Sequence, residues 1–129
     1  MKKILITRKL LRSNEERISK IFEVKLNLKD EIYSQNKLIE LSKDCDGILS
    51  SIEDKFDKST IDKLPDKIKI ISNFAVGFGN IDIDSAKKRN IVVTNTPDVL
   101  TKATAEIAML LILGAARRIV EGIKYVRNK

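Results

Sequence analysis

Short apolar runs alternate along the chain with amphipathic segments, and this alternation predicts the secondary structure. Runs that are rich in Ile, Val and Leu, with little polar interruption, are typical of strands buried on both faces of a sheet. The predicted strands lie at residues 2–7, 23–28, 67–74 and 91–95, with a further strand entered through residues 44–49. Strands that alternate with helices indicate an α/β fold with a parallel sheet and right-handed crossovers.

Helical periodicity and capping signals occupy the segments between these strands. Ser13 and Glu16 give the S-x-x-E form of a capping box, which predicts a helix start. Asp30 and Asp82 are placed to cap two further helices, and Pro65 stops a third. The helices are predicted near residues 13–22, 30–41, 57–64 and 81–89.

The last and longest predicted helix starts at Thr101 and runs toward residue 126. Between Ala103 and Ala116 it is apolar on all sides, which is typical of a helix in the middle of a larger assembly. One sheet cannot cover all of these side chains. We therefore expect a domain boundary near residue 100 and self-association as a homodimer through residues 101–127.

The composition excludes several classes of site. The 129 residues include no histidine, which excludes Ser-His-Asp and Cys-His catalysis and any His-ligated metal. The single cysteine, Cys45, forms neither an internal disulfide nor a cysteine metal cluster, and it is expected to be an inert core residue. No metal site is predicted.

The net charge of +7 does not indicate a nucleic-acid surface. Most of the excess lies near the end of the chain, where Tyr125 is the only aromatic residue, whereas nucleic-acid surfaces interleave cations with aromatic side chains. The cations concerned are Arg117, Arg118, Lys124, Arg127 and Lys129, opposed by Glu121. No nucleic-acid partner is predicted.

Apolar stretches in the sequence predict neither a signal peptide nor a membrane span. Arg8, Lys9 and Arg12 interrupt the N-terminal apolar run before a signal-peptide core can form. The stretch from Ile107 to Ala116 is about half the length needed to cross a bilayer. We expect a soluble, cytoplasmic protein with no membrane partner.

Candidate chemistry lies in the loop that follows the predicted strand 67–74. Gly77-Phe78-Gly79 gives a G-x-G before a helix, but the third glycine of a dinucleotide fingerprint would fall at Asp82, whose charge opposes a pyrophosphate. Two interpretations remain. The glycines could serve a turn with positive φ, or the loop could expose successive backbone N–H groups to a small carboxylate.

Several segments carry a resemblance to a known family. Residues 73–82, 89–101, 103–106 and 115–118 resemble the D-isomer-specific 2-hydroxyacid dehydrogenases, closest to the glyoxylate/hydroxypyruvate reductases. The match is dense over residues 67–127 and looser over 1–66. The resemblance implies a flavodoxin-like parallel five-stranded sheet with flanking helices and a long C-terminal helix.

The resemblance also implies roles for particular residues. Backbone amides of Val76 and Gly77 would hold the substrate carboxylate, Ser50 would line the same cleft, and Thr104 would lie near the nicotinamide of NAD or NADP. Residues 1–100 would form the substrate-binding lobe, and 101–129 the helix at the domain junction and dimer contact. One departure is Gly79, where the family commonly has Asp, which would loosen the loop.

The family's Rossmann cofactor domain, substrate-orienting Arg and Glu–His acid/base pair have no counterpart in these 129 residues. No catalytic residue is therefore assigned, and we expect neither tight NAD(P) binding nor activity from this chain alone. The resemblance implies the N-terminal portion of an enzyme that reduces a small 2-oxo acid to a 2-hydroxy acid. The alternative is a self-standing, non-enzymatic module that binds carboxylates or another protein.

Overall fold

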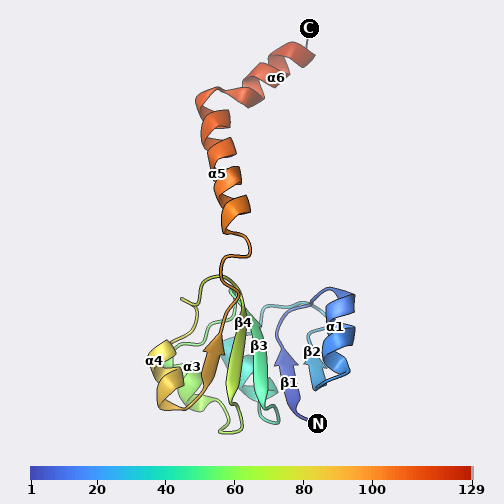
Figure 1. Ribbon diagram of the computed structural model, residues 1–129, viewed down its shortest axis with the longest axis vertical. Helices are drawn as coiled ribbons and strands as arrows, with labels where there is room; N and C mark the ends of the chain where they lie inside the picture. The colour runs from blue at the N-terminus through green and yellow to red at the C-terminus, as the bar shows by residue number, and fades with distance from the viewer. Residues whose placement is uncertain (129) are drawn as a thin grey trace. The chain divides into compact units, whose positions relative to one another are not determined.

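Five strands form one parallel sheet in the order β2-β1-β3-β4-β5 (Figure 1). The computed structural model describes residues 1–128. The strands are β1 Lys3–Ile6, β2 Glu23–Leu26, β3 Gly47–Ser51, β4 Ile70–Phe74 and β5 Val92–Thr94. Every pairing between neighbouring strands is parallel, which confirms the fold class predicted from the alternating pattern.

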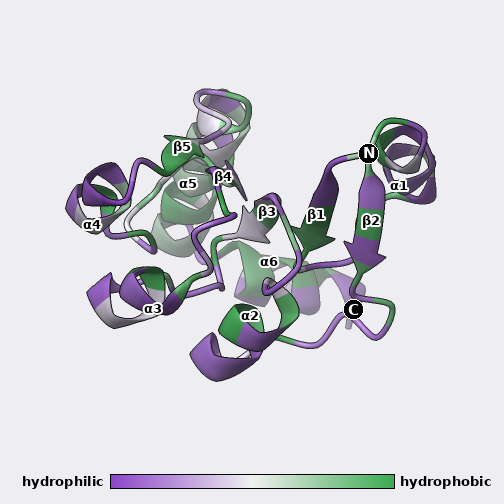
Figure 2. Cartoon of the chain, turned by 90° about the horizontal axis from the view of Figure 1, so that it is seen from below, coloured by the Kyte–Doolittle hydropathy of each residue, from purple (hydrophilic) through white to green (hydrophobic). Residues whose placement is uncertain are grey.

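Helices α2, α3 and α4 lie side by side on one face of the sheet, with hydrophobic residues turned toward the strands (Figure 2). Residues from both layers form the buried core, including Leu5, Ile48 and Ile71 from the strands and Leu38, Ile61 and Ala86 from the helices. The four helices of this unit are α1 Arg12–Ser19, α2 Gln35–Leu41, α3 Lys58–Lys63 and α4 Ile83–Lys88. Cys45 is fully buried within the core, as expected.

Capping was predicted correctly for α4 and incorrectly for α1. The Asp82 side chain accepts a hydrogen bond from the Ser85 N–H at 2.9 Å and so caps α4. In α1 the N-cap residue is Leu11, which makes no side-chain cap. The capping box at Ser13 is therefore wrong, because the helix begins at Arg12 and Glu15 instead accepts from the Leu10 N–H.

The predicted cap at Asp30 is also wrong. Helix α2 begins at Gln35 and is capped by Ser34, whose side chain accepts from the Lys37 N–H. Asp30 has a positive φ of 54° and accepts hydrogen bonds from the Arg8 side chain and from the Lys9 N–H. The Asp30 carboxylate therefore binds residues more than 20 positions away in the sequence and does not cap the helix that follows it.

Residues Asp98–Lys129 make a second compact unit, separate from Met1–Pro97. The predicted C-terminal helical segment is present, but it is divided into α5 Thr101–Ala116 and α6 Ile119–Arg127. The break falls at Arg118, whose left-handed backbone (φ 50°, ψ 45°) cannot continue an α-helix. The prediction of one unbroken helix to residue 126 is therefore wrong.

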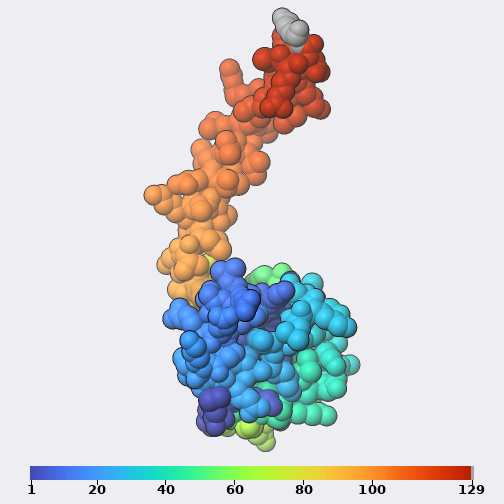
Figure 3. All heavy atoms as spheres, turned by 90° about the vertical axis from the view of Figure 1, so that its right-hand side faces the viewer, coloured from blue at the N-terminus to red at the C-terminus, as the bar shows by residue number. Residues whose placement is uncertain are grey.

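Large apolar residues of α5 are exposed; the segment is drawn in orange in Figure 3. No residue of α5 or α6 is buried. More than half of the side-chain surface is exposed at Ile107, Met109, Leu110, Leu111, Ile112 and Leu113. Within residues 1–128, no helix combines the length and the apolar character that a membrane crossing requires.

Candidate carboxylate-binding site

The loop of residues 75–80 joins β4 to α4 at the carboxyl edge of the sheet, where open α/β folds bind their ligands. Three consecutive carbonyl groups of this loop accept hydrogen bonds from the body of the unit. The Ala75 oxygen accepts from the Thr96 N–H at 2.9 Å. The Val76 oxygen accepts from Asn95 Nδ2 at 2.8 Å, and the Gly77 oxygen accepts from Asn73 Nδ2 at 2.9 Å.

These three bonds fix the direction of the N–H groups that follow. In a planar trans peptide the C=O of one residue and the N–H of the next point in opposite directions. The N–H groups of Val76, Gly77 and Phe78 therefore each point away from the donor that holds the preceding carbonyl. None of these three N–H groups has an acceptor among the described residues. The loop therefore offers a row of unpaired donors to an anion.

The glycines of this loop do not serve a turn with positive φ, so that interpretation of Gly77 and Gly79 is wrong. No described glycine has a positive φ. A Cβ built on Gly77 or Gly79 would meet nothing within 4 Å, so space inside the fold does not require glycine either. The absent side chain leaves the neighbouring N–H groups open to approach from solvent.

Beneath the loop, buried amide and hydroxyl groups hold its two ends together. Asn73, at the end of β4, is 1% exposed, and its Nδ2 also donates to Asn80 Oδ1 at 3.0 Å. Asn80 Nδ2 donates in turn to the Ser51 and Asp54 carbonyl oxygens. Ser50, predicted to line the cleft, is 2% exposed and donates its hydroxyl to Asn73 Oδ1 at 3.0 Å. It lies below the loop and not at its surface.

No role was predicted from the sequence for Asn73, Asn80 or Asn95, although the segments that contain them lie at the expected ligand-binding edge of the sheet. The signal that could have found them is their placement. Each asparagine stands where a strand of the parallel sheet ends or where the loop returns to it. Side-chain amides at such positions can bond to backbone groups that no strand partner satisfies.

The cation at this edge of the sheet is already paired. Arg8, just after β1, bonds to Asp30 at 2.8 Å and approaches Glu53 at 3.2 Å. The hydrogen bond from Arg8, assisted by the Lys9 N–H, lowers the pKa of Asp30 to about 2. Two carboxylates thus neutralise the Arg8 guanidinium.

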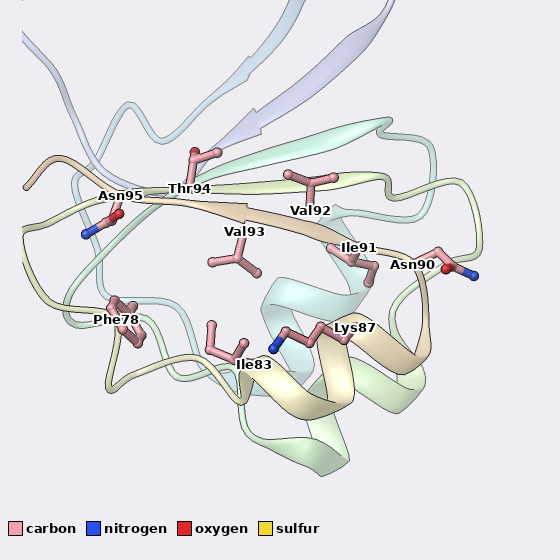
Figure 4. A pocket seen from close by; sticks show the side chains of 9 residues that line it. All are labelled: Phe78, Ile83, Lys87, Asn90, Ile91, Val92, Val93, Thr94 and Asn95. Atoms are coloured by element: carbon pink, nitrogen blue, oxygen red, sulfur yellow. The ribbon is translucent and has the colours of Figure 1, made fainter.

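A pocket of about 540 Å³ lies beside the loop, between α4 and β5 (Figure 4). Ile83 and Lys87 come from α4 and Val93 from β5, while Phe78 and Asn95 join the pocket to the loop. Lys87 is the one charged residue among those that line it. No cluster of described side chains in the protein could hold a metal ion.

The predicted cofactor residue, Thr104, lies in the first part of α5 and is exposed. It belongs to the second unit, whereas Val76, Gly77 and Ser50 belong to the first. The G-x-G of the loop does not fit a dinucleotide. The carboxylate of Asp82 already accepts an N–H of the first turn of α4, which is the group that a pyrophosphate would need.

Residues 4–123 match the family model described as the D-isomer specific 2-hydroxyacid dehydrogenase catalytic domain. The chain belongs to this family. A glyoxylate reductase of Thermococcus onnurineus (strain NA1) is 40% identical over 126 residues, and a glycerate dehydrogenase of Hyphomicrobium methylovorum is 42% identical over 128. The matches cover 98% and 99% of this chain but 37% and 40% of those proteins.

The solved structure of a similar protein shows the same fold. It is an NADPH-dependent glyoxylate/hydroxypyruvate reductase from Sinorhizobium meliloti in complex with citrate. It superposes with a TM-score of 0.77 at 31% identity, covering all of this chain and 39% of that one. This chain therefore spans about 40% of the length of these relatives, and it matches their catalytic domain.

Proposed function

We propose that residues 1–100 form the substrate-binding lobe of an NAD(P)-dependent D-2-hydroxyacid dehydrogenase that reduces a small 2-oxo acid such as glyoxylate or hydroxypyruvate. The N–H groups of Val76 and Gly77 bind the substrate carboxylate. The observation that carries this proposal is the row of three hydrogen-bonded carbonyls, each followed by an N–H group that has no acceptor among the described residues. The family membership and the relatives that reduce such acids support it.

Backbone amides suit this role because they are neutral donors held in place before the ligand arrives. A carboxylate oxygen accepts two such bonds without the cost of bringing a side chain to order. We expect weak affinity, because the family's substrate-orienting Arg has no counterpart in this chain, and Arg8 is paired with Asp30 and Glu53. Ser50 is buried, so it contributes through its hydrogen bond to Asn73 and not by direct contact.

We assign the nicotinamide cofactor, NAD or NADP, to the whole enzyme and not to this lobe. Bound there, it would supply the hydride that reduces the 2-oxo group. In this chain Thr104 is the one residue that the family resemblance places near it. Residues 101–129 are proposed as the segment at the domain junction, where their exposed apolar side chains form the contact with a second copy.

An NMR titration of the chain with oxalate and with glyoxylate tests the carboxylate site. We expect amide shifts confined to residues 74–79 and absent with glycolaldehyde, which lacks the carboxylate. Gly77→Val should fold normally, because its Cβ meets nothing within 4 Å, and should lose these shifts. Shifts spread evenly over the cations of residues 117–127, or unchanged in Gly77→Val, would overturn the proposal.

A further inference from the structure

We propose that Asn95 and Asn73 are positioning residues for the carboxylate loop, and that the Phe78 N–H is its third donor. This inference rests on the proposed function, because it concerns the same loop and the same ligand. It goes further in assigning a cause to the direction of each amide. Two side chains from outside the loop set the orientation of two successive peptide groups within it.

Asn95 controls the peptide between Val76 and Gly77. It stands directly after β5, and its Nδ2 reaches across to the Val76 oxygen after β4 at 2.8 Å. Because that oxygen is held toward Asn95, the Gly77 N–H points the opposite way. Without this bond the peptide is free to rotate, which would turn a carbonyl oxygen toward the ligand carboxylate and the donor away from it.

Asn73 controls the peptide between Gly77 and Phe78 in the same manner. Its Oδ1 accepts from Ser50 and its Nδ2 donates to both the Gly77 oxygen and Asn80 Oδ1. A reversed amide would set its oxygen against two other oxygens, so its orientation is fixed by its partners. The Phe78 N–H therefore points away from Asn73, and Phe78 itself is exposed.

Burial separates the two asparagines and decides how each can be tested. Asn73 is 1% exposed and every polar atom of its side chain has a partner, so its replacement would disturb the β3 and β4 ends as well. Asn95 is only partly buried, and its side chain makes one hydrogen bond, to the loop. Asn95 is therefore the position to substitute, and the Phe78 N–H is the group to observe.

The test compares Asn95→Ala and Asn95→Gln with Thr94→Ala. Thr94 is the preceding residue, and its hydroxyl donates to Ser72 of β4 without touching the loop, so it serves as a matched control. We expect oxalate affinity to fall roughly five- to tenfold in Asn95→Ala, as the loss of one hydrogen bond implies. Thr94→Ala should bind like the unsubstituted chain, and Asn95→Gln, which keeps a donor, should recover part of the loss.

Two spectroscopic readouts separate positioning from a general loss of structure. In Asn95→Ala without ligand, the amide nitrogen resonance of Gly77 should shift, while the amide resonances of β1, β2 and β3 should not change. In the unsubstituted chain, oxalate should slow hydrogen exchange at the N–H groups of Val76, Gly77 and Phe78. If oxalate slows hydrogen exchange at Gly77 but not at Phe78, the assignment of the Phe78 N–H as a third donor is wrong.

The outcomes distinguish this inference from the proposed function. If the unsubstituted chain shows no oxalate shifts at residues 74–79, the carboxylate site itself is wrong. If it binds oxalate and Asn95→Ala binds equally well with an unmoved Gly77 resonance, the site stands and the positioning role is overturned. Equal losses in Asn95→Ala and Thr94→Ala would overturn it as well, because they would reflect the strand and not the loop.

Discussion

The Thr7 hydroxyl donates a hydrogen bond to Oδ2 of Asp54, and both residues are fully buried. This bond joins the end of β1 to the turn after β3, and the Asp54 carbonyl oxygen in turn accepts from Asn80 of the candidate loop. The Ser51 N–H donates to the same oxygen at 2.9 Å, while Oδ1 has no partner among the described residues. Burial raises the pKa of Asp54, against the opposing effect of these two hydrogen bonds.

The raised pKa of Asp54 predicts a loss of stability as the pH increases. Its folded pKa lies above the unfolded value of about 3.9, so the native state binds the proton more tightly. The contribution of Asp54 to stability is full below the unfolded pKa and declines as the pH rises through the folded pKa. We therefore expect Asp54→Asn to gain stability relative to the unsubstituted chain as the pH rises above the unfolded pKa of about 3.9.

Asp30→Asn is the matched control, because the pKa of Asp30 is shifted in the opposite direction to that of Asp54. Arg8 and the Lys9 N–H lower the pKa of Asp30 to about 2, so its contribution is present above the unfolded pKa and is lost in acid. Asparagine also tolerates the positive φ at this position. Urea unfolding at several pH values measures both differences. Parallel curves for Asp54→Asn and the unsubstituted chain would contradict a raised pKa.

Two glycines should respond differently to alanine. A Cβ on Gly47, in the central strand β3, would lie 2.8 Å from Cγ2 of Ile70, whereas one on Gly77 would meet nothing within 4 Å. Overpacking in a core costs about 1–3 kcal/mol, so Gly47→Ala should lower the free energy of unfolding by that amount. Gly77→Ala should change it little. Denaturant midpoints measure both, and equal losses would contradict the structural distinction.

We predict that the isolated chain does not catalyse oxidation of NADH or NADPH with glyoxylate or hydroxypyruvate. Reduction of a 2-oxo acid needs a positioned proton donor and a bound nicotinamide. The 129 residues contain no histidine, and the loop that carries the G-x-G does not fit a pyrophosphate. Absorbance at 340 nm measures the reaction, and steady oxidation that scales with protein concentration would contradict the prediction.

Self-association through residues 101–127 is predicted from the exposed apolar surface of α5. Each large apolar side chain that becomes buried contributes about 1.5–3 kcal/mol before the cost of association. Leu111→Lys or Ile112→Lys should yield monomers or insoluble protein, since both side chains are more than half exposed in one chain. Sedimentation equilibrium measures the state. A monomer of the unsubstituted chain at high micromolar concentration would refute this contact.

Much of the fold could be predicted from local patterns in the sequence. The parallel sheet followed from β-branched runs that alternate with helices, and the start of α4 followed from Asp82, because both signals act within a few residues. The same local signals failed at Asp30, whose carboxylate accepts a hydrogen bond from Arg8, 22 residues away, and does not cap a helix. They also failed at Arg118, where the left-handed backbone breaks a helix that the apolar pattern continues.

Local patterns and the family resemblance were enough to predict the family, the α/β sheet and the loop in which the candidate site lies. The sequence placed Val76 and Gly77 in that loop through a resemblance, but it could not say which way their N–H groups point. Tertiary structure decided this, because the donors that hold the carbonyls of residues 75, 76 and 77 come from Thr96, Asn95 and Asn73. The direction of a peptide group depends on partners that only the folded sheet brings together.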